Sequence, residues 1–396
     1  MKIKGRKGIS LIVLVITIIV MIILAAAIIL SLSNNGIIGK ANKAKTDSDT
    51  ANLKEYVNTL RAEWELMTDA ERTESGAKTF EEYANKKLNE SGYGNVAVSP
   101  VDGEVYANLS ENAKKVIMAG IKVGDVVTGY TVTEKSYNTS GEENTADLDE
   151  NVDKGPQSNT ITTNTNVTWK YLGISSNGKI EMIAMLGKDE LSLDKRLMLS
   201  GKGGYLKGPE VLNTVCKELY SKNGVGTARS MNIDDVIKLL GYTGNKGKYI
   251  NNNGDEIETA GELTVAEILK SNGVSGLTNK ITPDGKDIMQ YKSNCYSIGE
   301  TVDKDKITNL NNVALIYGDM TSYWVASNCA MLDLVNNNVE YSVRYVDPDI
   351  KYVSRLFIFD SSNYFNGFPY AVRPVVELES NVSVSYDNTT HILSLN

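Results

Sequence analysis

The chain has 396 residues, of which 41% are hydrophobic and 23% are charged, and its formal net charge at pH 7 is −8. This composition predicts a chain that folds over most of its length rather than a disordered one. Residues 46–396 hold 34 basic and 49 acidic residues, and such an acidic body repels phosphate backbones, so nucleic acid is not an expected partner. Only one histidine, His391, is present, which excludes a two-histidine zinc site within one chain, and we predict neither a metal nor a cofactor.

Residues 9–32 form an uncharged apolar run, ISLIVLVITIIVMIILAAAIILSL. As a helix this run extends about 36 Å, compared with about 30 Å for the hydrocarbon core of a bilayer. It also exceeds the apolar region of about 7–15 residues in a cleaved secretory signal, so we predict a transmembrane helix. The basic residues before the run favour an N-terminus in the cytoplasm. We therefore expect a single-pass protein of the cytoplasmic membrane with an extracellular C-terminal body.

The start of the chain, KGISLIVLVITIIV, resembles the type IV prepilins. Lys7 and Gly8 match the end of the basic leader, Ile9 matches the first mature residue, and the resemblance covers residues 1–45. It implies cleavage after Gly8 by a prepilin peptidase, methylation of the new N-terminus, and other pilin-like subunits as partners. Val13 stands where the family has a glutamate, as in the minor or tip subunits that also lack this acid.

A helical extension and spacer is predicted over residues 33–120. Its longest helix is predicted over about 50–67, where apolar side chains recur at helical spacing: Leu53, Tyr56, Val57, Leu60, Trp64 and Met67. Thr79 and Glu82 predict a capping box before a helix over 80–89. Ser110 is the expected cap of a further helix that ends before Gly120.

Strands and short helices are predicted to alternate through residues 121–396. Residues 169–174 and 179–185 predict a hairpin, and a helix is expected to start near Pro209 and another to span 233–240. Further strands are predicted at 126–132, 312–318, 323–327, 341–346, 371–378 and 382–387. The polar stretch 136–166 predicts a long loop, and its acidic segment DLDENVD lacks the glycine and the ligand spacing of an EF-hand.

This second region carries another resemblance. The series IKVGDVV, WKYLGISSNGKIEMIAM, GGYLKGPEVLNTVCKELYS, ARSMNIDDV, SYWVASNCA, YSVRYV and AVRPVVEL resembles an uncharacterised surface domain of Gram-positive bacteria, which is itself similar to the C-type-lectin-like fold. The expected class is therefore α+β: a pilin-like transmembrane helix, short amphipathic helices, and a mixed β-rich C-type-lectin-like domain. The expected divisions are a leader at 1–8, a transmembrane helix at 9–32, the spacer at 33–120 and the outer domain at 121–396.

Aromatic residues gather near the end of the outer domain, with amides and hydroxyls between them. Flat apolar rings beside hydrogen-bonding groups suit a glycan or a protein ligand. The candidate ligand-binding residues are Phe357, Phe359, Tyr364, Phe365, Phe368, Tyr370 and Trp324. The alternative is that these rings fill the core. Arg373 is expected at a strand edge or bulge beside Pro374, with a structural carboxylate as its partner.

Two functions remain open from the sequence. One is a surface-displayed, pilin-like protein, a minor or tip pilin whose outer domain binds a ligand in adhesion. The other is a signal-anchored structural protein of the envelope that enters no filament, which the valine at position 13 favours. No catalytic residues are predicted, because the single histidine and the lack of a paired-carboxylate motif leave little for an enzyme to use.

Overall fold

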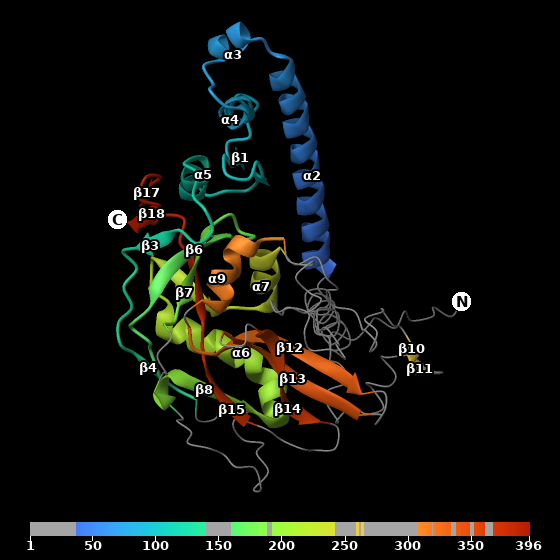
Figure 1. Ribbon diagram of the computed structural model, residues 1–396, viewed down its shortest axis with the longest axis vertical. Helices are drawn as coiled ribbons and strands as arrows, with labels where there is room; N and C mark the ends of the chain where they lie inside the picture. Colours follow the sequence, from blue (N-terminus) through green and yellow to red (C-terminus); the bar gives the residue numbers. More distant parts are fainter. Residues whose placement is uncertain are drawn as a thin grey trace, which may run out of the picture. The chain divides into compact units, whose positions relative to one another are not determined.

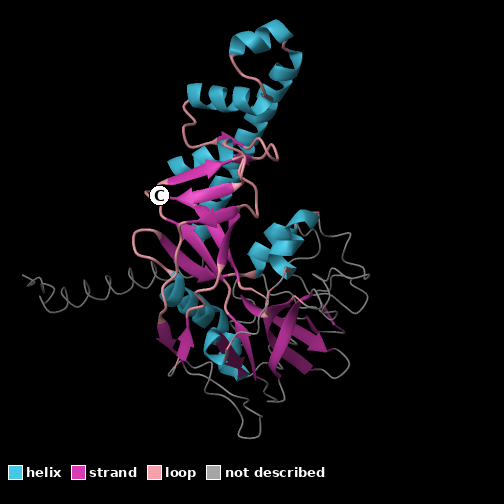
Figure 2. Ribbon diagram, turned by 60° about the vertical axis from the view of Figure 1, so that its left-hand side comes forward, coloured by secondary structure: helices cyan, strands magenta, loops and turns pink. Residues whose placement is uncertain are grey.

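The computed structural model describes residues 37–139, 160–187, 192–241, 259–260, 263–264, 308–318, 320–333, 338–348, 352–360 and 367–396. They belong to two compact units, the first within residues 1–98 and 103–107 and the second within 99–102 and 108–396. The described residues form a mixed α+β structure with seven α-helices, as the sequence predicts (Figure 1, Figure 2). The apolar run 9–32 lies outside them. None of the helices among the described residues is long and apolar enough to span a membrane.

The first unit is built on one long helix. It contains α2 (Ile37–Leu66), α3 (Asp69–Ser75), α4 (Phe80–Glu90) and a small ladder of β1 (Ala97–Val98) with β2 (Val105–Tyr106). The buried side chains of its core are Leu53, Val57, Leu60, Phe80, Tyr83, Ala84, Leu88, Val96 and Val98. Helix α2 confirms the helix predicted over about 50–67, and Leu53, Val57 and Leu60 form its buried face as expected. The helix starts earlier than predicted, at Ile37.

Side chains satisfy the backbone at the ends of these helices. Thr79 caps α4 as predicted, accepting from the amide of Glu82 at 3.3 Å, whereas the Glu82 carboxylate accepts from the Lys78 amide at 2.7 Å. Thr68 and Glu71 form a full capping box at the start of α3, which the sequence analysis missed. The Thr79 cap and the capping box of Thr68 and Glu71 satisfy backbone amides that a helix start leaves without partners.

Two large mixed sheets make up most of the second unit. The seven-stranded sheet has the order β17 (Val384–Asp387), β18 (Ile392–Leu395), β3 (Val126–Thr128), β6 (Thr168–Ile174), β7 (Ile180–Met185), β16 (Pro374–Leu378) and β9 (Gly226–Ser230). The five-stranded sheet has the order β14 (Tyr352–Asp360), β13 (Asn338–Asp347), β12 (Tyr323–Asp333), β15 (Gly367–Ala371) and β8 (Arg196–Ser200). In each sheet one pair is parallel, β18 with β3 and β12 with β15, and the other pairs are antiparallel. Two short ladders pair β4 (Ser136–Asn138) with β5 (Thr160–Thr162), and β10 (Thr259–Ala260) with β11 (Leu263–Thr264).

Helix α6 (Gly201–Tyr220) joins the two sheets of this unit, because it contacts β9 and β16 of one and β8, β12, β13 and β14 of the other (Figure 1). Its buried face includes Val211, Leu212, Val215, Cys216, Leu219 and Tyr220. The other helical segments are α5 (Glu111–Met118), η2 (Leu193–Lys195), α7 (Ile233–Leu240), η4 (Leu310–Asn312) and α9 (Val313–Tyr317).

Several local predictions for this unit are confirmed. The hairpin β6–β7 turns at residues 175–178, where Gly178 has a φ of +70°. Ser110 caps α5 by accepting from the amide of Ala113. Helix α7 ends at Gly241, which has a left-handed φ of +56°.

Other predictions were wrong. The strand predicted over 312–318 is the helix α9, whose Leu315, Ile316 and Tyr317 are buried. Short apolar runs fit a buried strand or a buried helix equally well, so the tertiary contacts decide. The helix expected to begin at Pro209 begins at Gly201 and contains that proline.

Two predicted strands and one predicted loop also differ from the structure. The single strand expected over 371–378 is two strands in different sheets, β15 and β16, with Val372 and Arg373 between them. Strand β3 ends at Thr128, before Gly129, whose backbone has a left-handed φ of +86°. A Cβ at Gly129 would crowd the backbone of Leu395. The predicted loop 136–166 carries β4 and β5 at its two ends, and residues 140–159, which include DLDENVD, lie outside the described residues.

Candidate functional site

The aromatic candidates are distributed over strands that are not neighbours. Phe357 and Phe359 lie in β14, whereas Phe368 and Tyr370 lie in β15. Strands β13 and β12 lie between β14 and β15, so β14 and β15 are about 14 Å apart at the usual strand spacing. Tyr364 and Phe365 lie outside the described residues. The structure thus does not bring the strand residues of this group into one continuous row.

Trp324 and Tyr370 do meet, and a third ring joins them. Trp324 is fully buried and its indole N–H donates to the carbonyl of Leu197 at 2.8 Å. The half-buried Tyr370 lies edge-on to Trp324 at 5.1 Å between ring centroids and stacks on Tyr345 at 5.1 Å with 3° between the planes. Trp324 therefore supports the tyrosine pair from the core. Tyr345 is not among the residues predicted from the sequence, and it stands opposite Trp324 in the β12–β13 register.

Burial dominates the chemistry of Tyr370. It raises the pKa of Tyr370 to about 12, and Tyr345 and Asp347 act in the same direction. The phenol is therefore neutral at physiological pH and offers a hydrogen bond rather than a charge.

Arg373 is a structural residue, and its partners differ from the expected carboxylate. The side chain is fully buried, and its guanidinium donates to the carbonyls of Ala184 and Leu315 and to the hydroxyl of Tyr323. Burial lowers the pKa of Arg373, and Tyr323 and Asp235 act in the opposite direction. These bonds join β7, α9 and the start of β12, and they show why the chain between β15 and β16 leaves both sheets at this point.

A second cation holds an ion-pair network. Arg229 contacts both carboxylate oxygens of Asp235, at 2.6 and 2.8 Å, and Glu181 at 2.8 Å. Burial alone would lower the pKa of Arg229, but the bonds and charges of Asp235 and Glu181 outweigh it and raise the pKa. Asp235 also caps α7 by accepting from the amide of Asn232. The network fixes α7 against β9 and β7.

Metal-binding and reactive groups are few among the described residues. No group of three or more His, Cys, Asp or Glu residues there is arranged to hold a metal ion. Cys216 is a buried free thiol in α6. His391 is half-exposed, and its Nδ1 lies 3.2 Å from the hydroxyl of Tyr386, which donates to Asp125 at 2.7 Å.

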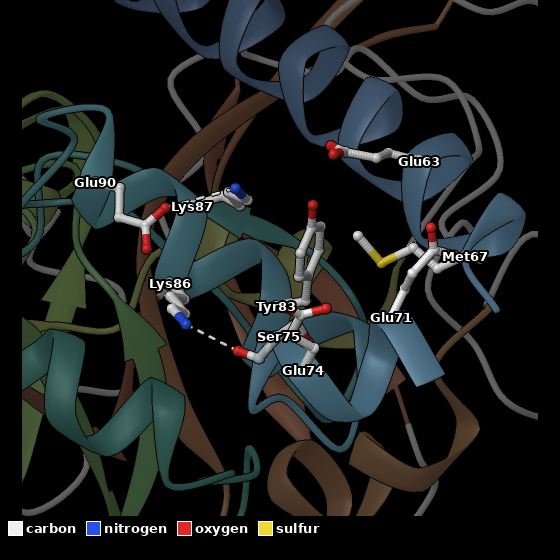
Figure 3. Close-up of a pocket in the computed structure, with 9 residues that line it drawn as sticks. All are labelled: Glu63, Met67, Glu71, Glu74, Ser75, Tyr83, Lys86, Lys87 and Glu90. Carbon is white, nitrogen blue, oxygen red and sulfur yellow. Dashed lines mark hydrogen bonds and ion pairs between the residues drawn. The ribbon is translucent and has the colours of Figure 1, made fainter. Parts of the chain in front are cut away.

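A separate pocket lies in the first unit, between α2, α3 and α4 (Figure 3). Its volume is about 220 Å³. The lining residues are Glu63 from α2, Met67 just after the end of α2, Glu71, Glu74 and Ser75 from α3, and Tyr83, Lys86, Lys87 and Glu90 from α4. Four carboxylates and two ammonium groups give this lining a net charge of −2.

Tyr83 forms the buried wall of this pocket. Its side chain is only 1% exposed and lies against Trp64, with 5.3 Å between the ring centroids. Its hydroxyl is buried and makes no hydrogen bond within the part of the chain that is described. Burial raises the pKa of Tyr83 to about 12, with Glu63 as the next cause, so the group is a neutral phenol. Figure 3 shows the hydroxyl directed toward the side of the pocket that Glu63 and Met67 form.

The two lysines of the pocket are already engaged. Lys86 donates to the carbonyl of Ser75 at 2.8 Å, and Lys87 lies 3.6 Å from Glu90. Hydrogen bonds from the backbone and side chain of Thr68 lower the pKa of Glu71 and keep its carboxylate ionised. The residues of this pocket are not among those predicted from the sequence. The only signal for it is the helical spacing of Glu63 with Met67 and of Tyr83 with Lys87 and Glu90, which places each set on one face of its helix.

The processing residues Lys7, Gly8 and Ile9 lie outside the described residues. No family model, curated protein or solved structure matches this chain.

Proposed function

We propose that this chain is a membrane-anchored, surface-displayed, pilin-like protein, a minor or tip pilin, whose outer domain binds a ligand in adhesion. The observation that carries the proposal is the start of the sequence, in which a short basic leader and Gly8 precede an uncharged run of 24 residues beginning at Ile9. That order of charge, small residue and apolar run suits cleavage at the cytoplasmic face of a membrane that the run then crosses.

The arrangement of the first unit is consistent with this proposal. Helix α2 begins at Ile37, shortly after the apolar run ends, and continues for 30 residues. Its apolar stripe of Leu53, Val57 and Leu60 packs within its own unit. A long helix that leaves the membrane would carry the small unit packed on it away from the bilayer.

The outer domain is proposed to have a C-type-lectin-like fold and to bind a glycan or a protein. This proposal is supported by the resemblance of residues 121–396 to the uncharacterised surface domain of Gram-positive bacteria. It is also supported by the two large mixed sheets that α6 joins. Such a framework presents loops, and members of one fold rarely share chemistry, so binding rather than catalysis is proposed. Tyr345 and Tyr370, whose rings stack with 5.1 Å between their centroids, are the proposed aromatic contacts with such a ligand.

Val13 favours a second function. A buried glutamate would make the membrane helix seek a partner, and valine removes that need. The chain would then be a signal-anchored structural protein of the envelope that assembles into no filament.

The N-terminus of protein recovered from membranes distinguishes these functions. Intact-mass and N-terminal peptide analysis should find a chain that begins at methylated Ile9. A Gly8→Leu variant should keep the leader, because a large side chain cannot enter the site that accepts glycine, and a Gly5→Leu variant is the matched control that should be cleaved normally. An intact Met1 in the unaltered protein would support the anchored structural protein, and a full-length chain soluble without detergent would contradict both.

A further inference from the structure

The pocket between α2, α3 and α4 has negative charge that its own cations do not neutralise. Glu90 pairs with Lys87, and Glu71 accepts the amide and hydroxyl of Thr68. Neither Glu63 nor Glu74 pairs with a cation among the residues that the structure describes. An incoming cation would therefore meet two carboxylates that have no other ion partner.

The pocket also contains a buried polar atom that needs a partner. The hydroxyl of Tyr83 has no partner within hydrogen-bond distance in the described part of the chain, although Tyr83 is only 1% exposed, and the Glu63 carboxylate is the acceptor whose interaction with this hydroxyl helps to raise the pKa of Tyr83. Buried polar atoms are normally satisfied, and one that is not marks the place of a ligand or an ordered water. A phenol oxygen can accept from an N–H donor while its own proton turns toward the Glu63 carboxylate.

We propose that this pocket binds an alkyl cation of the lysine or arginine type, with the ammonium or guanidinium group held between the Glu63 carboxylate and the Tyr83 hydroxyl. The alkyl stem lies along the Met67 thioether, which is apolar and adaptable. Glu74 adds a second negative charge at the wall that α3 forms. This site is in a different unit from the aromatic rings of the outer domain, and it does not depend on the proposed function.

Charge and size together select this class of ligand. The net charge of the lining is −2, and both lysines already have acceptors, so an anion would find no free donor among them. The pocket volume of about 220 Å³ is below the roughly 300–1,000 Å³ of sites for drug-sized molecules. A single side chain or a small amine fits such a space.

Methyl NMR of the full-length chain in detergent tests the proposal. The chain has eleven methionines, so labelling with 13C-methyl methionine gives a small set of signals, and a Met67→Leu variant assigns the signal of Met67. Titration with n-butylammonium chloride and with n-butylguanidinium chloride should shift the Met67 signal saturably. Equal concentrations of sodium chloride and sodium butyrate, which control for salt and for the alkyl chain, should not.

Variants of the two head-group contacts sharpen the test. Tyr83→Phe keeps the ring and removes the oxygen, and Glu63→Gln keeps the shape and removes the charge. Each should weaken binding of n-butylammonium at least about threefold, a typical effect of losing one partly exposed charged contact in Glu63→Gln or one hydrogen bond in Tyr83→Phe. Glu65→Gln is the matched control, because Glu65 is exposed on the same helix but does not line the pocket. Its affinity should equal that of the unaltered chain.

The results also separate the two sources of such a cation. An acetylated and amidated Gly-Lys-Gly peptide that binds more tightly than n-butylammonium would identify a lysine side chain of a protein, and equal or weaker binding would identify a free amine. The proposal is overturned if Met67 responds to neither cation beyond its response to sodium chloride, since the pocket then holds only water. It is overturned equally if butyrate binds as well, or if Tyr83→Phe and Glu63→Gln both bind as the unaltered chain does.

Discussion

Gly178 shows how one residue can fix a junction within the second unit. It closes the β6–β7 turn at a φ of +70°, its carbonyl accepts from the amide of Ser110, and a Cβ there would overlap the carbonyl oxygen of Asn108. Two demands therefore coincide at this position, a left-handed backbone and the close approach of a second chain segment.

Gly178→Ala should lower the free energy of unfolding by at least about 3 kcal/mol, the sum of left-handed strain and overpacking. Gly224→Ala is the matched control, because Gly224 has a φ of +71° and no atom within 4 Å of an added Cβ, so only strain of about 1 kcal/mol is expected. Urea unfolding of the full chain in detergent measures both. Equal losses in the two variants would contradict the close approach at Asn108.

Cys216 illustrates how burial controls a reactive group. Its side chain is fully buried in α6, and burial raises the pKa of the thiol to about 12, although Ser230 and Arg229 act in the opposite direction. The thiolate is the reactive form, so a raised pKa and lack of access both suppress reaction.

We expect Cys216 to resist thiol reagents at pH 8 in the native protein. A Cys295→Ser and Cys329→Ser double variant leaves this cysteine as the sole thiol of the chain. Its labelling by a chromogenic disulfide reagent should be slow and should accelerate sharply through the urea unfolding transition. Rapid labelling without urea would show that α6 opens locally.

At the level of elements, α7 is held by one carboxylate with two tasks. Asp235 accepts from the amide of Asn232 at 2.8 Å, completing a capping box, and it receives both bonds from Arg229. The start of α7 and the ion-pair network therefore depend on the same side chain, which is 9% exposed. Removing its charge would leave Arg229 half-buried with Glu181 alone.

Asp235→Asn should lower the free energy of unfolding by about 3 kcal/mol, the usual loss when a partly buried ion pair loses one member. Asp234→Asn alters the adjacent, exposed carboxylate in the same helical turn and should cost less than about 1 kcal/mol. Thermal unfolding followed by circular dichroism measures the difference. If both changes cost the same, the network adds nothing beyond the helix dipole.

At the scale of the whole molecule, the chain has two compact units and each has its own buried core. Its three tryptophans divide between them, because Trp64 belongs to the first unit and Trp169 and Trp324 belong to the second. Labelling with fluorotryptophan therefore provides a separate 19F signal for the unfolding of each unit.

Leu88→Ala should shift the unfolding transition reported by the Trp64 signal to a lower urea concentration. The transitions reported by the signals of Trp169 and Trp324 should stay in place. Leu88 is fully buried in α4, and such truncations cost about 2–5 kcal/mol. Leu212→Ala changes an equally buried position of α6. It should shift the transitions reported by Trp169 and Trp324 and leave the transition reported by Trp64 in place. If either variant moves all three signals together, the two units unfold as one.

Features that depend on near neighbours in the chain could be worked out from residue order. The apolar stripe of α2, the caps Thr79 and Ser110, the Gly241 helix end and the β6–β7 turn all involve residues within a few positions of one another. Their physics is local, because helical spacing, capping bonds and turn geometry require no distant partner.

Features that depend on distant segments could not be worked out from residue order. The run 312–318 became a helix in a buried setting where Arg373 and Tyr323 satisfy its last carbonyls, and β15 and β16 separated because Arg373 turns into the core between two sheets. The pocket around Tyr83 required α2, α3 and α4 to meet, and the partner of Tyr370 came from β13. Patterns along the chain show which faces are apolar, but which buried face meets which is settled by packing among segments far apart in sequence.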